Sequence, residues 1–252
     1  MPNNRSARLA LATGGGFVLA IAVGVYNIEL FQAINGGHGP LLDVFFGLVG
    51  GLGDGLIIAI ILTALMLFHL RAGLTGLLAF GLSGLMAQML KHSFDAPRPA
   101  AVLDDVHVLG QTLTNNSFPS GHATSLGALA MLLTLLFGRR DPRVWFAVAV
   151  LLLAAVGRVY GGVHFPLDVL VGLALGAVCT AAIWPMVNHW RTQGWESSSW
   201  AWNIPALAVL IEAAVLGLGY KVQPATAQPL ALVLSVGALA WLAWMWRHRP
   251  GY

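Results

Sequence analysis

Long apolar runs separated by short polar breaks dominate the sequence. A helix needs about 17–25 mostly apolar residues to cross the roughly 30 Å hydrocarbon core of a bilayer. Eight runs approach or reach this length, at roughly 9–26, 48–68, 72–91, 122–138, 143–160, 167–187, 203–220 and 229–246. The pattern therefore predicts an all-α integral membrane protein with about eight transmembrane helices.

Two segments interrupt these runs. Residues 27–47 mix polar and apolar positions around the breaker Asn35–Pro40, and we expect them to lie at the membrane interface. Residues 93–120 form the longest polar stretch and are rich in Pro, Asp and Asn, which indicates a loop. The chain shows no convincing internal repeat and no separate soluble domain.

The composition excludes an ordinary soluble surface. Hydrophobic residues make up 58% of the chain and charged residues 9%, whereas a soluble domain carries about 25% charged residues. The 30 glycines are spread through the apolar runs, as suits close helix packing in lipid. Cys179 is the single cysteine, so neither an intramolecular disulfide nor a zinc cluster is expected. The first run follows Arg5 and Arg8 without a cleavage motif, which indicates a retained anchor.

The distribution of Lys and Arg predicts the orientation in the membrane. With the N-terminus in the cytoplasm, nine of the 13 basic residues fall on the cytoplasmic side, which also places the C-terminus there. These nine are Arg5, Arg8, Arg71, Arg139, Arg140, Arg143, Arg191, Arg247 and Arg249. The outer side receives only Lys91, Arg98, Arg158 and Lys221.

Three polar clusters on that outer side contain the chemistry. They are Lys91–Pro99 (KHSFDAPRP), Phe118–His122 (FPSGH) and Gly157–Asp168 (GRVYGGVHFPLD). All three fall on one membrane face in a topology drawn from charge and hydropathy alone. Taken singly, each cation has an alternative role in anchoring a helix end at the interface.

The first group of these side chains suits a phosphate. Lys91, Arg98 and Arg158 supply positive charge without a carboxylate cluster to neutralise them, and arginine binds phosphate oxygens bidentately. Ser120 suits the N-cap of a helix, and the free N–H groups at the start of a helix bind anions. Helix capping without phosphate binding is the alternative role of Ser120. Gly121 allows a ligand to approach the backbone. The set meets the main demand of phosphoryl transfer, which is charge stabilisation.

The two histidines of these clusters differ in their neighbours. His164 has Asp168 four residues later, and a carboxylate that holds one imidazole nitrogen leaves the other free to attack. His122 has no such partner in its segment and suits protonation of a leaving oxygen. No carboxylate pair offers a magnesium site, so we expect chemistry through a phosphohistidine without metal or cofactor.

The order K-x6-R-P, P-S-G-H and R-x5-H-x3-D resembles the type 2 phosphatidic acid phosphatases, which share a site with vanadium-dependent haloperoxidases. The resemblance implies a six-helix core over roughly 48–187 plus the first span. It also implies phosphate binding by Lys91, Arg98, Ser120, Gly121 and Arg158. His122 would be the general acid, His164 the nucleophile and Asp168 its orienting partner. The family commonly has Ser where this chain has Gly157, which removes one possible hydrogen bond.

These observations lead to a functional hypothesis with alternatives. We expect residues 1–190 to form the phosphatase core and 191–252 an additional helical pair of open role. The expected activity is hydrolysis of a lipid phosphate or diphosphate at the outer face of a bacterial inner membrane. Undecaprenyl diphosphate is the leading substrate; phosphatidylglycerol phosphate, phosphatidic acid and lipid A 1-phosphate compete with it. The expected partners are this substrate and membrane lipids, with no nucleic acid.

Two other functions stay open. The same phosphohistidine would also serve a lipid-to-lipid phosphotransferase. A lipid transporter is the third possibility, because Glu212 is a carboxylate within a span, and ionisable residues within spans often have a functional role. Asp54 is expected only to cap a helix, and the polar side chains of the 93–120 loop are expected to be solvated.

Overall fold

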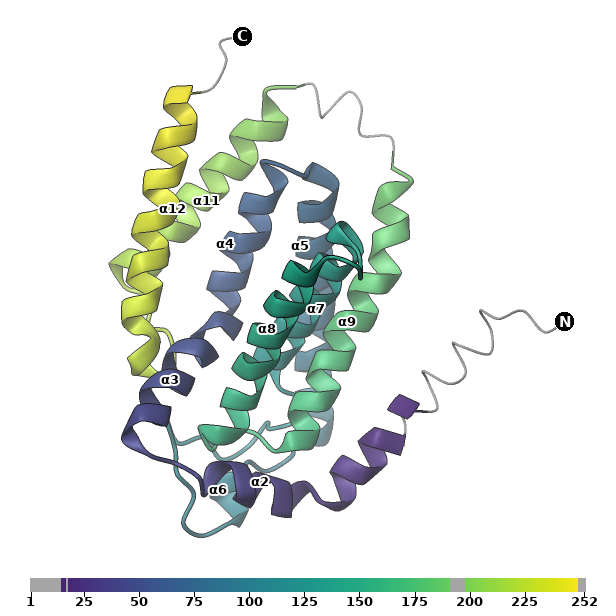
Figure 1. Ribbon diagram of the computed structural model, residues 1–252, viewed down its shortest axis with the longest axis vertical. Helices are drawn as coiled ribbons and strands as arrows, with labels where there is room; N and C mark the ends of the chain where they lie inside the picture. The colour runs from purple at the N-terminus through teal and green to yellow at the C-terminus, as the bar shows by residue number, and fades with distance from the viewer. Residues whose placement is uncertain (1–14, 17, 191–197, 249–252) are drawn as a thin grey trace, which may run out of the picture.

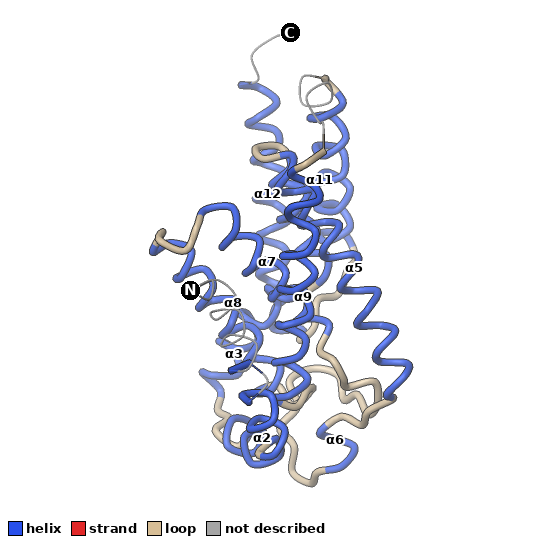
Figure 2. Tube along the Cα trace, turned by 90° about the vertical axis from the view of Figure 1, so that its right-hand side faces the viewer, coloured by secondary structure: helices blue, strands red, loops and turns tan. Residues whose placement is uncertain are grey.

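The computed structural model describes residues 15, 16, 18–190 and 198–248, and these residues form helices and loops without a strand (Figures 1 and 2). Arg5, Arg8, Arg191, Arg249 and most of residues 9–17, on which the expected anchor and part of the predicted orientation rest, lie outside the described residues. The all-helical class predicted from the apolar runs is confirmed.

The central bundle consists of α5 (Leu70–Phe94), α7 (Gly121–Phe137), α8 (Pro142–Tyr160) and α9 (Pro166–Asn188). In this bundle α7 packs against each of the other three (Figure 1). The contact between α7 and α9 is very close, because glycines of one helix face the backbone of the other. A Cβ atom added to Gly176 would overlap the carbonyl oxygen of Thr124 and would lie 2.6 Å from the nitrogen of Ala128.

We therefore expect Gly176→Ala to destabilise the protein. The added methyl has no free volume between α7 and α9, and such overpacking costs about 1–3 kcal/mol. Gly84 in α5 has nothing within 4 Å of an added Cβ, so Gly84→Ala is the matched control. Thermal unfolding in detergent should show a lower midpoint for Gly176→Ala only, and equal midpoints for the two variants would contradict the packing.

Two bent helix pairs precede the bundle. The helix Val18–Val25 meets α2 (Asn27–Asn35) at 69°, and the segment Pro40–Gly53 meets α4 (Gly55–Met66) at 53°. The second segment comprises α3 (Pro40–Gly50) and the 3₁₀ turn η1 (Gly51–Gly53). The predicted breaker is confirmed, since α2 ends at Asn35 and α3 begins at Pro40.

The span predicted over 48–68 is not one straight helix. Its helix breaks at Asp54, which has extended backbone and caps α4 through a side chain that accepts a hydrogen bond from the nitrogen of Leu56 at 2.9 Å. A glycine-rich run offers little helical preference, and the capping carboxylate satisfies a backbone donor at the new helix start. The expected capping role of Asp54 is therefore confirmed.

The C-terminal pair is formed by α11 (Trp200–Leu218) and α12 (Gln228–His248), joined by a loop that contains η2 (Ala225–Ala227). The pair lies at one edge of the molecule, and α11 packs against α4 (Figure 1). Ile57 and Ile60 of α4 share a buried cluster with Val209 and Leu216 of α11. The pair is therefore anchored to the rest of the protein by its own apolar core.

The seven predicted apolar runs from residue 48 onward each correspond to a helix or to a bent pair, and the described end of the first run lies in the helix Val18–Val25. By length and composition, five helices of the described chain are able to cross a membrane, or seven if each bent pair is one span, and α7 is a shorter apolar helix. The protein is a multi-pass membrane protein.

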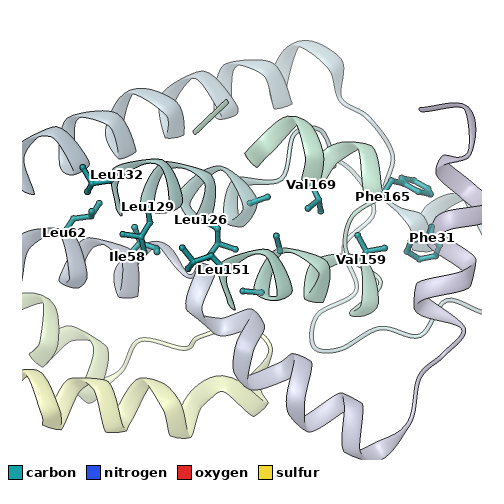
Figure 3. Close-up of a cluster of buried hydrophobic side chains, with 13 residues drawn as sticks. Phe31, Ile58, Leu62, Leu126, Leu129, Leu132, Leu151, Val159, Phe165 and Val169 are labelled. Atoms are coloured by element: carbon teal, nitrogen blue, oxygen red, sulfur yellow. The ribbon is translucent and has the colours of Figure 1, made fainter. Parts of the chain in front are cut away.

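The main buried cluster runs along the bundle from Leu62 and Leu132 to Phe165 and Phe31, from left to right in Figure 3. Leu126 of α7 and Leu151 of α8 lie within it, and Val159 and Phe165 continue it toward the loop between α8 and α9. Phe31 of α2 meets Phe165 edge to face, with ring centroids 5.4 Å apart. This loop is therefore held between α2 and the bundle core.

Residues 95–120 form a loop as predicted, apart from the short helix α6 (Pro99–Val102), whereas residues 93 and 94 still belong to α5. The loop is fixed by Asn35, whose side-chain nitrogen donates to the carbonyl oxygens of His107 at 2.8 Å and Tyr160 at 2.7 Å. His107 was expected to be solvated, but it is half-buried, and its Nε2 lies 2.9 Å from a carboxylate oxygen of Asp43.

Candidate active site

The three polar clusters predicted from the sequence meet at one end of the bundle. The C-terminal ends of α5 and α8 and the N-terminal ends of α7 and α9 all lie there, beside α6 (Figure 1). Arg98 from the first cluster and His164 from the third are in direct contact, with Nη1 and Nε2 3.5 Å apart. The convergence expected from hydropathy and charge is thus present in the fold.

His164 lies in the loop between α8 and α9, and only 3% of it is exposed. The loop folds back over the end of α8, where the backbone nitrogens of Val163 and His164 both donate to the carbonyl oxygen of Arg158. Asp168 follows one turn into α9, and its Oδ2 lies 3.6 Å from Nδ1 of His164. Nδ1 therefore faces the carboxylate, while Nε2 faces Arg98.

The carboxylate of Asp168 is itself held in place. Its Oδ2 accepts hydrogen bonds from the backbone nitrogen of Phe165 at 2.9 Å and from the hydroxyl of Ser117 at 2.6 Å. The Ser117 hydroxyl also lies 3.5 Å from Nδ1 of His164. Such a network fixes the orientation of the imidazole ring.

The sequence interpretation missed Ser117, a buried residue of this site. It lies two residues beyond Asn115, in a loop whose side chains were expected to be solvated, yet it is fully buried. Its backbone nitrogen donates to the carbonyl oxygen of Ala96 at 2.9 Å. A small polar residue directly before the FPSGH cluster was the available signal, but its pairing with Asp168 depends on tertiary contacts.

The first two cations are positioned by neutral backbone oxygens. Arg98 donates from Nε to the carbonyl of Asn115 at 2.9 Å and from Nη1 to the carbonyl of Val163 at 2.9 Å. Lys91 donates from Nζ to the carbonyl of Asn116 at 2.6 Å. These bonds orient the side chains without neutralising their charges, so the positive field of the site is retained. Asn115 and Asn116 thus contribute through their backbones.

Two buried polar groups at this end have no partner in the described protein. They are Nε of Arg158 and Nε2 of His122. An unpaired buried polar group costs about 1–3 kcal/mol, so such groups point to a ligand that completes their bonding. A guanidinium and an imidazole nitrogen together suit an anion with an ester or anhydride oxygen.

The N-terminus of α7 completes the arrangement. Ser120 caps this helix by accepting from the nitrogen of Ala123 at 3.4 Å, so its capping role is confirmed. Its own backbone nitrogen donates to the carbonyl of Asp168 at 3.0 Å, which joins α7 to α9. An added Cβ at Gly121 would meet nothing within 4 Å, so the backbone there is open to a ligand.

Burial keeps His164 neutral. Removal of the ring from water lowers the pKa of His164 well below its ordinary value; the hydrogen bond with Asp168 opposes this shift, and the charges of Arg98 and Arg158 add to it. The imidazole is therefore unprotonated at neutral pH, and the nitrogen facing Arg98 carries a free lone pair.

Gly157 lies against α3. A Cβ atom added there would lie 3.4 Å from both Cδ1 and the carbonyl oxygen of Phe46, and 3.6 Å from Cα of Gly50. The space beside Arg158 that a serine side chain would use is thus bordered closely by α3. The bent α3–α4 segment is therefore a direct neighbour of the site.

Two further observations concern possible metal ligands and a second cavity. Among the described residues, no group of three or more His, Cys, Asp or Glu side chains is placed to hold a metal ion. A cavity of about 860 Å³ lies at the opposite end of the molecule, between the α4–α5 turn and the ends of α9 and α12, lined by His69 and Trp202 among others. We assign the chemistry to the polar cluster rather than to this cavity, because the convergent cations are at the other end.

Comparison with known proteins places these motifs in a family. The family described as the PAP2 superfamily matches residues 72–192, a range that contains all eight predicted site residues. An undecaprenyl-diphosphatase of Sulfolobus acidocaldarius is 31% identical over 159 residues, which cover 60% of this chain and 74% of the relative. A lipid A 4′-phosphatase of Porphyromonas gingivalis is 30% identical over 183 residues, covering 68% of this chain and 76% of the relative. The crystal structure of Aquifex aeolicus LpxE superposes with a TM-score of 0.58 at 36% identity, covering 62% of this chain and 93% of that one.

Proposed function

Since this chain belongs to the PAP2 superfamily and is a membrane lipid phosphatase, we propose that it cleaves its substrate through a phosphohistidine on His164. The observation that carries the proposal is the pair of contacts on the two ring nitrogens. Nδ1 faces Asp168 at 3.6 Å, and Nε2 lies 3.5 Å from the guanidinium of Arg98. A phosphate bound to that guanidinium places phosphorus next to the nitrogen that carries the lone pair.

The reaction then proceeds in two displacements. Nε2 of His164 forms a bond to phosphorus while the bond from phosphorus to the leaving oxygen breaks. His122 donates a proton to that oxygen, which leaves as the lipid alcohol or lipid monophosphate. Water then attacks the phosphohistidine, His122 accepts its proton, and inorganic phosphate departs. Asp168 stabilises the positive charge that the imidazole gains in the first step.

The cations lower the barrier to both steps. Lys91, Arg98 and Arg158 surround the phosphoryl oxygens, whose charge is redistributed in the transition state. The open backbone at Gly121 and the start of α7, capped by Ser120, add peptide N–H donors to the same oxygens. The carbonyls that hold Arg98 and Lys91 fix these charges before the substrate arrives, so little reorganisation is needed.

Undecaprenyl diphosphate is the proposed substrate. One relative is named as an undecaprenyl-diphosphatase, and another is named as a lipid A 4′-phosphatase. Phosphatidylglycerol phosphate, phosphatidic acid and lipid A 1-phosphate remain the alternative substrates. A lipid acceptor in place of water would make the enzyme a phosphotransferase, which a mass balance on labelled phosphate distinguishes from hydrolysis.

The proposed function is tested by phosphate release from a panel of these lipids in detergent micelles. We expect the highest kcat/KM for undecaprenyl diphosphate and the same rate after dialysis against EDTA, because the charge stabilisation comes from side chains. A strict requirement for a divalent cation would contradict the mechanism. Faster turnover of another lipid on the panel would reassign the substrate and leave the mechanism intact.

We propose that the site faces the periplasm of a bacterial inner membrane. The basic residues Arg71, Arg139, Arg140, Arg143 and Arg247 lie at helix ends opposite to the site. Such basic ends stay in the cytoplasm.

Cysteine labelling tests this orientation. In a Cys179→Ala background, Gln111→Cys lies in the exposed loop at the site, and Arg140→Cys lies in the exposed α7–α8 turn at the other end. We expect a membrane-impermeant maleimide to modify the first in intact spheroplasts and the second only after lysis. The reverse pattern would place the site in the cytoplasm.

A further inference from the structure

The bent segment between α3 and α4 borders the proposed site directly. A Cβ atom added to Gly53 would lie 3.1 Å from Cβ and 3.3 Å from Cδ2 of His122. Three residues earlier, Gly50 packs beside Gly157, the neighbour of Arg158. The break in the helix therefore brings Asp54 to the side of the site that is formed by His122 and Arg158.

Asp54 is a buried carboxylate, with 5% of its surface exposed. Its Oδ1 accepts from the backbone nitrogen of Leu56 at 2.9 Å, and its Oδ2 accepts from the hydroxyl of Tyr220 at 3.1 Å. The negative charge of Asp54 attracts the guanidinium of Arg158, while the charge of Arg98 repels it. Nε of Arg158 has no hydrogen-bond partner in the described structure, so no such bond fixes that side of its guanidinium.

Tyr220 comes from the loop that joins α11 to α12. Gln228 fixes this loop, because its side chain donates to the carbonyl of Tyr220 at 3.0 Å and accepts from the nitrogen of Val222 at 3.0 Å. The loop also packs tightly on the bent segment, where a Cβ atom added to Gly51 would lie 2.6 Å from Cβ of Ala227. Tyr220 is thus held against Asp54 by contacts independent of their hydrogen bond.

The tyrosine hydroxyl is a permanent donor. Partial burial and the negative charge of Asp54 raise the pKa of Tyr220 to about 12, so its proton stays in place at any working pH. The two oxygens of Asp54 are therefore both occupied, one by the helix cap and one by Tyr220. A carboxylate held in this way attracts Arg158 without swinging inward to form a bidentate pair that would exclude phosphate.

We propose that Asp54 and Tyr220 are positioning residues for Arg158, and that the C-terminal helical pair is therefore a working part of the phosphate site. The proposal rests on the function proposed above. It assigns a role to a region beyond residues 72–192, the segment that matches the family. It also revises the predicted division at residue 190, because the core and the C-terminal pair share this contact.

A double-mutant cycle on phosphate release tests the proposal. Asparagine is as good a helix cap as aspartate, so Asp54→Asn removes the charge and keeps the cap. We expect kcat/KM to fall about 10-fold to 100-fold, as for a misplaced catalytic group. In an Arg158→Lys background, which has no planar fork to orient, the same change should cost less than about 2-fold. Independent structural damage would instead be additive in the two backgrounds.

Tyr220→Phe provides a second route if Asp54→Asn folds poorly. Loss of one hydrogen bond predicts a fall in kcat/KM of about 3-fold to 10-fold, and this loss should disappear in the Arg158→Lys background. The matched control is Asp141→Asn, because Asp141 caps α8 at the other end of the molecule by accepting from the nitrogen of Arg143 at 2.9 Å. This control should leave the kinetics unchanged.

The outcomes separate this proposal from the function on which it rests. Additive losses, or no loss in either variant, with normal phosphate release by the unmodified protein would overturn the positioning role alone. Absence of phosphate release by the unmodified protein would overturn the proposed function. In that case the same cycle on orthovanadate binding, measured by calorimetry, still decides whether Asp54 acts through Arg158, since it needs no turnover.

Discussion

Replacement of His164 by alanine is expected to abolish phosphate release while the protein remains folded in the membrane. The variant removes the imidazole nitrogen that lies 3.5 Å from Nη1 of Arg98 and so deletes the proposed attacking atom. Loss of a nucleophile from an intact site lowers kcat by at least about 10,000-fold. Release of inorganic phosphate from undecaprenyl diphosphate, followed at saturating lipid, measures the effect.

The control for this prediction is His189→Ala. His189 is exposed at the far end of α9, and its ring contacts only the carbonyl of Pro185 in the described structure. We expect His189→Ala to retain full activity. Turnover by His164→Ala at even one-hundredth of the original rate, in a protein with an unchanged thermal midpoint, would exclude His164 as the nucleophile.

The second large effect is expected from Arg158→Met. Arg158 is 8% exposed, and its Nε has no partner in the described protein. We therefore expect its buried charge to bind the phosphate of the substrate. Removing an arginine that stabilises phosphoryl transfer costs about 10³–10⁵ in kcat. Replacing this buried guanidinium by an apolar side chain of similar length relieves its desolvation, so the thermal midpoint should stay level or rise.

Arg143→Met is the control for the arginine. Arg143 is exposed at the start of α8 and pairs with Asp141 at 2.8 Å, far from the site. This variant should keep its activity. A large fall in the stability of Arg158→Met would contradict the view that Arg158 serves the ligand, because it would reveal a structural partner for the guanidinium.

Much of this architecture is predictable from the sequence because its signals are local. Most of the apolar runs are long enough to specify a helix by themselves, and the distribution of basic residues places Lys91, Arg98 and Arg158 on one face. The spacing of His164 and Asp168 across the start of α9 brings the carboxylate to Nδ1, as the structure shows. The roles of these residues in catalysis are proposals that the variants above test.

The features that the sequence did not reveal depend on tertiary contacts. Ser117 contacts Asp168, which lies 51 positions later in the sequence, and the residues next to Ser117 in the sequence do not indicate that contact. Arg98 and Lys91 are held by backbone oxygens, which every residue type has, so the sequence does not identify these acceptors. The contact of Tyr220 with Asp54 joins two helical units 166 positions apart. Residue identity alone does not encode such pairs.

The bend at Asp54 has a different origin. Gly51, Leu52 and Gly53 lie within an apolar run, so hydropathy alone favours a continuous span there. Helix geometry is weaker at these glycines, and the α11–α12 loop packs so closely on them that a Cβ atom at Gly51 would lie 2.6 Å from Ala227. Hydropathy reports the position of a segment in the membrane, whereas the bend depends on packing.

The most direct test of the account is identification of the phosphorylated residue during turnover. Undecaprenyl diphosphate labelled in its terminal phosphate is mixed with the protein and quenched in alkali at millisecond intervals, and the peptides are mapped by mass spectrometry. We expect an acid-labile phosphoryl group on His164 that appears before free phosphate and is absent from His164→Ala. A phosphoryl group on His122 or on any other residue would contradict it, as would turnover with no protein-bound phosphate at any quench time.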